Sequence, residues 1–247
     1  MPRSKVNSNP NPNGITVRDA VHLDMEFTSL EEKVIDTPQL QRLRNIKQLG
    51  FAHFVYPSAN HTRFEHSLGV CHLTGIMIDR IAEKAHHGFK EKDRDRAIAR
   101  AFALVHDASH IPFGHTLEDE HNVFQRHDTG TRLLQIVDQP ELRNALDYLY
   151  EPVRAIIEQL GDESRSNHRT IHPFGDHYLT DIVAGTIGAD LLDYLRRDNL
   201  FTGLKREYDP RVLDYFEIRQ GQLVVNLKKH GMVRIDAVSD VMDLLRM

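Results

Sequence analysis

The sequence predicts a mainly α-helical bundle with one small β-hairpin near its C-terminal end. Two segments, 62–85 and 94–107, repeat apolar residues at intervals of three and four, as on the buried face of a helix. The clearest strand pattern is short and pairs 216–219 with 223–226. Because a chain of 247 residues can bury a substantial core, we expect residues 15–247 to form a single domain.

The N-terminal part is predicted to be irregular before the helices begin. Residues 1–14 are mostly Asn, Pro and Ser, so we expect a disordered tail there. Residues 15–25 alternate short apolar and polar positions, which indicates a strand or an extended arm. We place Ser29 as the N-cap of the first helix, because acidic residues follow it in the first turn.

A second helix is predicted from Asp36 to Gly50. Pro38 suits the first turn of a helix, and the apolar residues of this segment recur at intervals of three: Leu40, Leu43 and Ile46. Gly50 is expected to end the helix, and residues 51–62 are expected to form a loop.

The two strongest helical segments each carry histidine at a telling position. In the segment 62–85, His66 lies on the apolar face, together with Val70, Leu73, Met77 and Ile81. The segment 94–107 is almost wholly apolar from Ala97 onward and ends in His106 and Asp107. We expect this segment to be central, and Pro112 and Gly114 to break the chain after it.

The remaining chain is predicted to be helical with one polar loop and the C-terminal hairpin. Helices are expected at 120–137, 140–160, 178–198 and 233–246, and the loop at 161–174. The last helical pattern still runs at Met247 with no C-cap signal, so the sequence is expected to be the front part of a longer protein.

Composition and charge exclude several classes of protein. The net charge of −5 gives no general attraction to phosphate backbones, and the basic stretches 94–100 and 228–230 are short, so nucleic-acid binding is not expected. We find no apolar run long enough to span a membrane and no signal peptide. Cys71 is the only cysteine, which rules out an intrachain disulfide and favours a reducing, cytoplasmic location.

Four side chains of the sequence can donate lone pairs to a divalent metal ion: His66, His106, Asp107 and Asp190. With 16 histidines and one cysteine, the ligands of such an ion must be imidazole and carboxylate, which suits Mn, Fe, Co, Ni, Zn or Mg. Because His66, the doublet His106-Asp107 and Asp190 lie on three different predicted helices, only tertiary packing can bring them together. Taken alone, His66 on an apolar face is more often an ordinary core histidine.

Two further histidines, His110 and His115, follow the His106-Asp107 doublet. Imidazole titrates near neutrality, so either residue could protonate a leaving oxygen or deprotonate water. Glu118 follows His115 by three residues and is expected to orient it. Together with a metal ion, these residues predict a hydrolytic centre.

Three motifs carry a resemblance to a known family: residues 63–70, which include His66, the doublet His106-Asp107, and residues 190–198. In this order they resemble the H…HD…D signature of the HD-domain metal-dependent phosphohydrolases. The match is closest to the deoxynucleoside triphosphate triphosphohydrolases. Residues 35–50 are especially similar to those of the sterile-alpha-motif and HD-domain dNTPases and their bacterial relatives. The resemblance runs from about Val17 to Asp198 and implies an HD-domain helical bundle.

The resemblance also implies roles for individual residues. It assigns the four metal-capable residues as ligands of one divalent ion and places His110 and His115 near the phosphates and the scissile bond. It implies that Arg63 contacts a phosphate oxygen and that His127 extends the histidine cluster. Four positions match residues that contact the deoxyribose: Gln48, Leu49, Tyr194 and Asp198.

The resemblance further implies an assembly of several copies. In some members an activating nucleotide binds at subunit contacts, and part of that site matches Asp36, Gln41 and Arg44. A homo-oligomer, a dimer or larger, is therefore expected.

The implied reaction is attack of water on the α-phosphorus of a deoxynucleoside triphosphate, which releases a deoxynucleoside and tripolyphosphate. Leu191 stands where some members have a phosphate-binding lysine, Ile15 replaces a lysine of the activating site, Ser109 replaces a loop glycine, and a further phosphate-binding arginine would fall beyond Met247. Two alternatives therefore stay open. One is hydrolysis of another nucleotide ester, such as a monophosphate, a cyclic nucleotide or an alarmone. The other is a non-catalytic nucleotide-binding assembly module.

Overall fold

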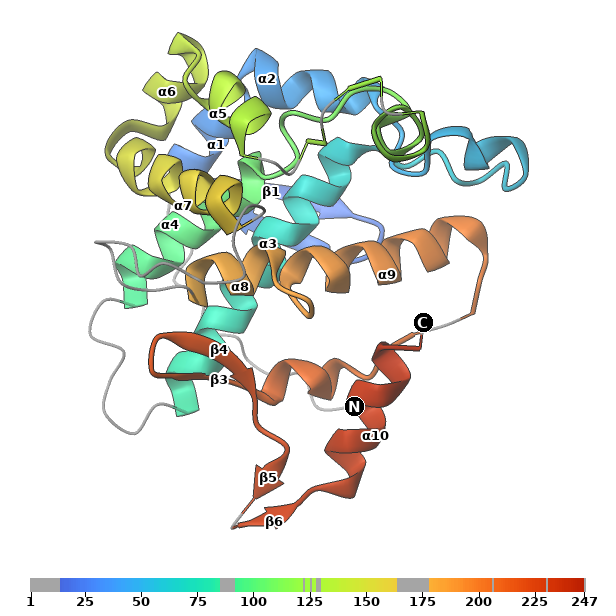
Figure 1. The fold of residues 1–247 in the computed structure, drawn as a ribbon, viewed down its shortest axis with the longest axis vertical. Helices are drawn as coiled ribbons and strands as arrows, with labels where there is room; N and C mark the ends of the chain where they lie inside the picture. The colour runs from blue at the N-terminus through green and yellow to red at the C-terminus, as the bar shows by residue number, and fades with distance from the viewer. Residues whose placement is uncertain are drawn as a thin grey trace.

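The computed structural model describes residues 14–84, 92–121, 123–124, 126–127, 130–163, 178–205, 207–229 and 231–246. The predicted tail, apart from Gly14, and most of the predicted polar loop 161–174 lie outside these residues. Within them, the structure is mainly α-helical with small two-stranded sheets, which confirms the predicted fold class (Figure 1).

The elements follow one another in this order. The N-terminal part contains β1 (Ile15–Asp19), β2 (Leu23–Phe27), α1 (Ser29–Ile35), α2 (Pro38–Gln41), the 3-10 turns η1 (Arg42–Asn45) and η2 (Gly50–Phe54), α3 (Arg63–Lys84) and α4 (Lys92–Val105). The middle contains the π-turn η3 (Thr116–Glu120), α5 (Thr131–Val137), α6 (Pro140–Leu146), η4 (Asp147–Leu149), α7 (Tyr150–Glu163), α8 (Tyr178–Ala184) and α9 (Ala189–Thr202). The C-terminal part contains η5 (Pro210–Asp214), β3 (Phe216–Arg219), β4 (Gln222–Val225), β5 (Lys228–Lys229), β6 (Met232–Val233) and α10 (Ile235–Leu244).

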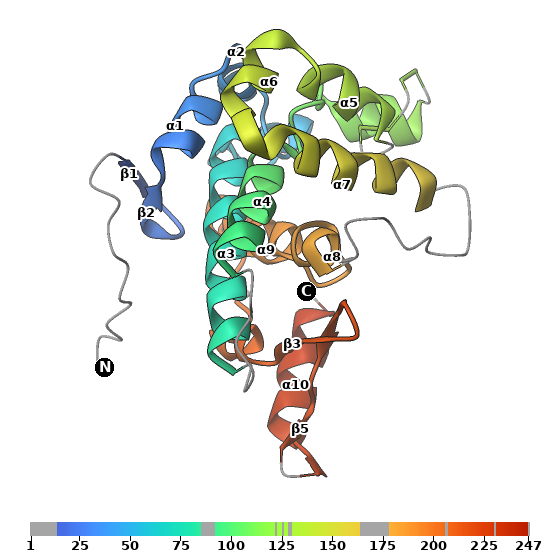
Figure 2. The same ribbon diagram turned by 90° about the vertical axis from the view of Figure 1, so that its left-hand side faces the viewer.

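The helices α3 and α4 pack side by side at the centre of the fold, and α9 packs against α3 (Figure 2). Their shared core is apolar: Val70 and Met77 on α3 and Phe102 and Leu104 on α4 have no exposed surface. Burying a side chain of this size stabilises the fold by about 1.5–3 kcal/mol. The helices α5 to α7 lie at one end of α3 and α4, and β3 and α10 lie toward the other (Figure 2). The two helices that carry the metal-capable histidines therefore have fixed positions in the core.

The first helix begins one residue earlier than predicted. Its N-cap is Thr28, because the Glu31 backbone N–H donates to the Thr28 hydroxyl at 3.3 Å and the Thr28 backbone N–H donates to the Glu31 carboxylate at 2.8 Å. This reciprocal pair is a capping box. Ser29 is the first helical residue, so its prediction as the N-cap was wrong.

The second predicted helix is much shorter than Asp36 to Gly50. It ends as the 3-10 turn η1, and Ile46 is extended with φ −112°. The Arg63 backbone N–H donates to the Ile46 carbonyl at 2.8 Å, and Lys47 pairs with Thr62 as an isolated β-bridge. This pairing pulls the chain out of the helix before Gly50, which begins η2 at φ +50° instead of ending a helix.

Three other predicted helices are interrupted. In 120–137 the helix α5 starts only at Thr131, and 140–160 is broken at Asp147, where φ is +52°. The predicted helix 178–198 is divided between α8 and α9. A Cβ at Gly188 would lie 2.5 Å from the Val183 carbonyl oxygen, so glycine permits the tight connection. As a result α9 begins at Ala189, with Asp190 in its first turn.

The predicted C-terminal hairpin is confirmed, with its second strand one residue earlier than expected. Phe216 pairs with Val225 and Arg219 with Gln222, and the turn residues Gln220 and Gly221 both have positive φ. The pairing of β1 with β2 and of β5 with β6 was not predicted. Among the described residues, no helix is long and apolar enough to cross a membrane.

Candidate metal centre

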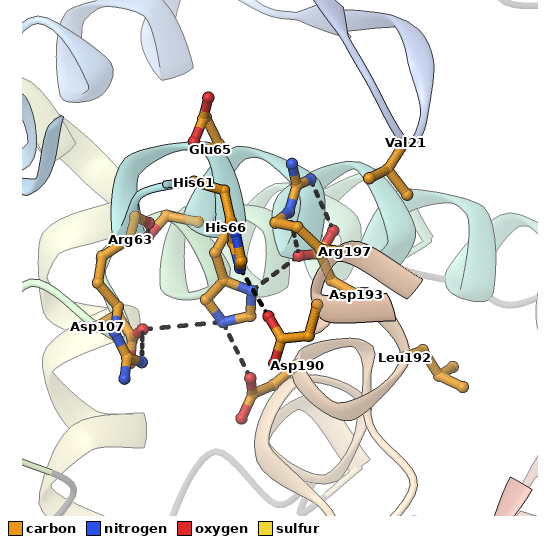
Figure 3. Close-up of polar contacts among 12 residues, drawn as sticks. Val21, His61, Arg63, Glu65, His66, Asp107, Asp190, Leu192, Asp193 and Arg197 are labelled. Atoms are coloured by element: carbon orange, nitrogen blue, oxygen red, sulfur yellow. Dashed lines mark hydrogen bonds and ion pairs between the residues drawn. The ribbon is translucent and has the colours of Figure 1, made fainter. Parts of the chain in front are cut away.

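His66 lies at the centre of a buried polar cluster between α3 and α9 (Figure 3). Its Nδ1 donates to the Asp193 carboxylate at 2.8 Å. Its Nε2 lies 3.0 Å from Asp190 Oδ1 and 3.8 Å from Asp107 Oδ2. The apolar face of α3 therefore turns this histidine toward two of the predicted carboxylate ligands.

The doublet His106-Asp107 follows the last residue of α4 directly. His106 Nδ1 donates to the Ala103 carbonyl at 2.7 Å, which leaves Nε2 as the nitrogen with a free lone pair. His106 Nε2 lies 3.6 Å from Asp107 Oδ1 and 4.0 Å from Asp190 Oδ1. The end of α4 and the first turn of α9 thus bring the remaining predicted ligands to the same place.

These residues fit a divalent metal ion. His66, His106 and Asp107 each offer a donor atom, and the three atoms lie within 4.8 Å of one another. The Nε2 atom of His106 is buried and has no hydrogen-bond partner among the described residues, and the buried Nε2 atom of His66 faces Asp190 Oδ1 at 3.0 Å. A buried nitrogen without a partner is costly, and a metal ion supplies one. Two imidazoles and two carboxylates suit several first-row ions.

The carboxylates around His66 favour its protonated form when no metal ion is bound. Burial lowers the pKa of His66, but hydrogen bonds and charge from Asp190 and Asp193 outweigh burial and raise that pKa to about 10. Burial raises the pKa of Asp107, but the charges of His110, Arg63 and His106 outweigh it and hold the carboxyl well below its usual range. A metal ion on His66 must displace this proton, so binding and deprotonation are coupled.

Asp193 is a functional residue that the sequence interpretation missed. It forms a salt bridge within α9, with Arg197 at 2.8 Å. The same carboxylate, however, accepts from His66 and, at 2.6 Å, from His22 in the β1–β2 turn. It therefore fixes the ring of His66 with Nε2 toward the metal position. The signal was available, because Asp193 follows Asp190 by one helical turn and shares its face.

Gly69 on α3 leaves the space that the Asp193 carboxylate and the Arg197 guanidinium occupy. A Cβ at Gly69 would lie 1.9 Å from Asp193 Oδ1 and 2.5 Å from Arg197 Nη2. Arg197 also donates to Asp19 at 2.8 Å, so its guanidinium pairs with the carboxylates of both Asp193 and Asp19. Burial raises the pKa of Asp193, but the contacts with Arg197, His22 and His66 outweigh it and keep the carboxyl ionised.

The predicted phosphate contact, Arg63, is paired within the site. Its Nη1 donates to Asp107 Oδ2 at 2.7 Å, and its Nη2 lies 3.4 Å from the Gln48 carbonyl oxygen. Both its partners border the same cleft, so its guanidinium lies beside the metal position.

Three histidines, His110, His115 and His127, form a second cluster beside the first. His110 is fully buried, and burial lowers its pKa to about 4. Glu118 was predicted to orient His115, but its hydrogen-bond partner is His127. The Glu118 carboxylate accepts from His127 Nδ1 at 2.7 Å. The partner of His115 is Asp119, because a helical spacing of four residues brings these two side chains together.

The loop that carries His110 is held by two arginines that were not predicted. Arg42 donates to the carbonyls of His110, at 2.8 Å, and of Ala108. Arg132 donates to the Ser109 carbonyl at 2.8 Å and to Glu118 at 2.5 Å. Burial raises the pKa of Glu118, but the hydrogen bonds from His127 and Arg132 outweigh it and lower the pKa to about 2.

One cleft of about 520 Å³ joins most of the predicted site residues. Its lining includes Gln48, Leu49, Arg63, His106, Asp107, His115, His127, Asp190, Tyr194 and Asp198. Arg126 also lines it and was not predicted. Asp198 is fixed by His61, whose Nε2 lies 2.7 Å from its carboxylate.

The three residues predicted for an activating site lie apart from this cleft. Gln41 donates to the Ile35 carbonyl at 2.9 Å, and Arg44 donates to Gln41 at 2.8 Å while its guanidinium stacks 3.7 Å over the Phe64 ring. Asp36 is the C-cap of α1. A nucleotide-binding role for these residues stays a prediction.

A family model described as the HD domain matches residues 63–198, which is more than half of the chain. This range begins with the motif of His66 and ends with that of Asp190.

Similar proteins are found among curated sequences and solved structures. An uncharacterized protein of Methanocaldococcus jannaschii is 33% identical over 90% of this chain and 42% of its own length. The deoxynucleoside triphosphate triphosphohydrolase SAMHD1 of Bos taurus is 30% identical over 92% of this chain and 42% of its own length. The crystal structure of a phosphohydrolase from Bacteroides thetaiotaomicron superposes with a TM-score of 0.75 at 26% identity, covering 94% of this chain and 53% of that one. The chain thus spans less than half the length of these two curated relatives.

Proposed function

This chain belongs to the HD domain family, and from that premise we propose that it hydrolyses deoxynucleoside triphosphates to a deoxynucleoside and tripolyphosphate in a metal-dependent reaction. The observation that carries the proposal is the cleft, because residues from four segments far apart in the sequence line it together. Its volume of about 520 Å³ falls in the range of small-molecule sites.

The proposed metal ligands are His66, His106, Asp107 and Asp190. A divalent ion held there supplies a bound water of lowered pKa and polarises a phosphoryl group. Two neutral imidazoles and two carboxylates leave such an ion near zero net charge. The Arg63 guanidinium, 2.7 Å from Asp107, also favours the ionised form of that carboxyl.

Arg63 and Arg126 are proposed to bind the phosphate chain. Arg63 is held beside the metal position by Asp107, and Arg126 lines the same cleft. A guanidinium can donate two parallel hydrogen bonds to phosphate oxygens. These two positive guanidinium groups would balance part of the negative charge of a triphosphate.

Proton transfer is proposed for His115 and His110. His115 is half-exposed on the cleft and can exchange its proton with solvent. His110 is fully buried beside the proposed metal ligand Asp107, with its Nε2 3.3 Å from Asp107 Oδ1. His127 and Glu118 are proposed to position these two rings rather than to transfer protons.

The deoxyribose is proposed to lie between Gln48 and Leu49 on one side and Tyr194 and Asp198 on the other. All four line the cleft, and His61 holds Asp198 through a 2.7 Å contact. A carboxylate fixed in this way can accept a hydrogen bond from a sugar hydroxyl.

One observation favours a second candidate function. Leu191 packs against the hydrophobic core and offers no charge where some family members have a phosphate-binding lysine. A shorter phosphate chain needs fewer cations, so hydrolysis of a nucleoside monophosphate or of a cyclic or alarmone nucleotide is the alternative.

A panel of nucleotides tests both candidates. The purified protein would be incubated with each nucleotide and with Mn²⁺, Mg²⁺, Co²⁺ or Ni²⁺, and the phosphate product identified. We expect tripolyphosphate from deoxynucleoside triphosphates; pyrophosphate or inorganic phosphate would favour the alternative. Tight nucleotide binding without turnover in any metal would instead indicate a non-catalytic assembly module.

The metal centre is tested by the double variant His106→Ala/Asp107→Ala. We expect it to lose at least about 100-fold in rate, because removal of ligands costs more than removal of their supporting residues. The exposed His121→Ala is the matched control and should keep the wild-type rate. Wild-type hydrolysis by the double variant would refute the proposal.

A further inference from the structure

The cluster of His110, His115 and His127 is itself built like a metal site. Each of the three offers a ring nitrogen, and the three nitrogen atoms lie within 4.8 Å of one another. The His110 and His127 rings are 3.5 Å apart at 30°, and the His115 ring stands edge-on to both at 5.4 and 5.2 Å. Tetrahedral zinc with Zn–N bonds of about 2.0–2.1 Å needs donor atoms roughly 3.4 Å apart, so the three rings must move closer and the overlapping His110 and His127 rings must turn until their nitrogens converge.

Two of these rings have the tautomer that a metal ligand requires. His127 Nδ1 donates to Glu118 at 2.7 Å, and His115 Nδ1 lies 3.3 Å from the Asp119 carboxylate. A carboxylate at Nδ1 directs the lone pair to Nε2. The same arrangement is seen at His66, where Asp193 holds Nδ1.

The third ring, His110, has a charged neighbour, Asp107, whose Oδ1 lies 3.3 Å from its Nε2 but outside hydrogen-bonding geometry. It is fully buried, and neither of its ring nitrogens has a hydrogen-bond partner among the described residues. Native proteins rarely leave such atoms unsatisfied, and an ion is one of the usual reasons when they do. A Cβ at Gly114 would lie 2.8 Å from His110 Nδ1, so this glycine preserves the space around the ring.

The carboxylates behind the rings are themselves neutralised. Arg132 donates to Glu118 at 2.5 Å, and Arg126 lies 3.2 Å from Asp119. They therefore orient the imidazoles without adding net charge at the position of an ion. Three neutral nitrogens and one open position match the donor set of zinc in His₃ sites.

We propose that His110, His115 and His127 bind a second divalent ion, Zn²⁺, and that its binding inhibits the hydrolase. Zinc on these nitrogens would occupy the lone pairs that the proposed proton transfer uses, and His115 and His127 line the cleft proposed for the nucleotide. The binding site rests on the geometry of the cluster alone, whereas the inhibition also rests on the proposed function.

The number of zinc ions bound per chain tests the site directly. The wild-type protein, the variant His115→Ala and the control His121→Ala would be equilibrated with Zn²⁺, and bound metal measured by elemental analysis and calorimetry. We expect two ions for the wild type and for His121→Ala, and one for His115→Ala. Because the His115 side chain is 55% exposed, this variant should fold normally, which a thermal unfolding curve checks.

A second protein separates the two sites. In His106→Ala/Asp190→Ala the first site is disabled by changes at side chains that are not fully buried. This protein should still bind one zinc ion, and adding His115→Ala should weaken that binding by at least about 100-fold, more than loss of a supporting residue would. Loss of all zinc binding in the folded double variant, or unchanged affinity after His115→Ala, would overturn the proposal.

Inhibition is measured separately on the Mn²⁺-loaded protein. Added Zn²⁺ should reduce turnover of the wild type and of His121→Ala, and the zinc concentration for half-inhibition should be the same for both. The variant Asp119→Asn should need about tenfold more zinc for half-inhibition, because His115 loses its orienting carboxylate. If no nucleotide is hydrolysed, the proposed function fails while the zinc count still decides the site. Turnover without zinc inhibition would overturn the inhibitory part.

Discussion

Two groups of histidines lie next to each other at the end of α4, and they differ in where their carboxylates stand. Around His66 and His106 the carboxylates of Asp107 and Asp190 share the space with the imidazole lone pairs. Around His115 and His127 the carboxylates stand behind the rings, at Nδ1. Position, not residue type, therefore separates a carboxylate that can bind an ion from one that orients a ligand.

The two clusters also differ in charge and in support. Two carboxylates in the first bring a divalent ion near neutrality, whereas the three imidazoles of the second leave it close to +2. The first is backed by the buried network of Asp193, Arg197 and Asp19, while the second rests on the short segments that follow α4, where Glu118 is buried and Asp119 is exposed. Changes behind the first cluster should therefore reach the whole fold, and changes behind the second should stay local.

The largest effect is expected from Gly69→Ala, which drives a Cβ into the Asp193 carboxylate at 1.9 Å. Moving this carboxylate breaks a buried ion pair, so the free energy of unfolding should fall by about 3–5 kcal/mol. The matched change in the second cluster, Gly114→Ala, meets the His110 ring at 2.8 Å and should cost only about 1 kcal/mol. Urea unfolding measures both, and equal losses would erase the proposed difference in support.

The next largest effect is expected from Asp193→Asn. The ring of His66 loses the acceptor that fixes its orientation, so Mn²⁺ affinity at the first cluster should fall by about 10–100-fold. Calorimetric titration with Mn²⁺ measures this change. Asp243→Asn, at an exposed carboxylate on α10, is the control and should bind as the wild type does. Unchanged affinity in Asp193→Asn would show that the buried network acts on the fold alone.

A smaller effect is expected from Glu118→Gln. His127 keeps a hydrogen-bonding neighbour but loses the charge that fixes its tautomer, so Zn²⁺ affinity at the second cluster should fall by about tenfold. The first cluster should keep its affinity for Mn²⁺. Glu120→Gln changes an exposed carboxylate in the same turn and serves as the control. Equal losses at both clusters would mean that they are one coupled site.

The smallest change in the free energy of unfolding is expected when the pH is varied near neutrality. The sign of this change differs between the two clusters. In the metal-free protein, the pKa of His66 is raised to about 10 and that of His110 is lowered to about 4. The stability that His66 contributes is complete below pH 6.5 and is lost as the pH rises toward 10. The stability that depends on neutral His110 is lost as the pH falls from 6.5 toward 4.

Imidazole NMR on the metal-free protein measures both groups. His66 should stay protonated and His110 neutral from pH 6 to pH 8. Titration of both rings near their ordinary pKa of about 6.5 would contradict the contrast.

Local patterns in the sequence predicted the main helices well. The apolar repeat around His66 and the apolar run before His106 correspond to α3 and α4, because buried helices leave a strong periodic signal. Breaks within helices were missed at Asp147 and Gly188. These breaks depend on tight backbone approaches, such as that of Gly188 to the Val183 carbonyl, which periodicity does not report.

In the candidate site, too, local patterns identified residues but did not predict their tertiary contacts. Asp190 was predicted as a metal-capable residue, but its position in the first turn of α9 follows from the break at Gly188. Glu118 was assigned to His115 from sequence spacing, whereas a loop closure brings His127 to it instead. The support from His22 reaches Asp193 across most of the chain, and no local pattern could predict it.

The helical fold class, the metal-capable residues and the family to which they belong could all be predicted from the amino-acid order, because local periodicity and ordered motifs are enough to identify them. Only the tertiary structure decided which carboxylates face the ion position and which stand behind an imidazole. The physical reason is that a ring nitrogen or a carboxylate oxygen acts through contacts of about 3 Å, and such contacts between distant segments are fixed by packing.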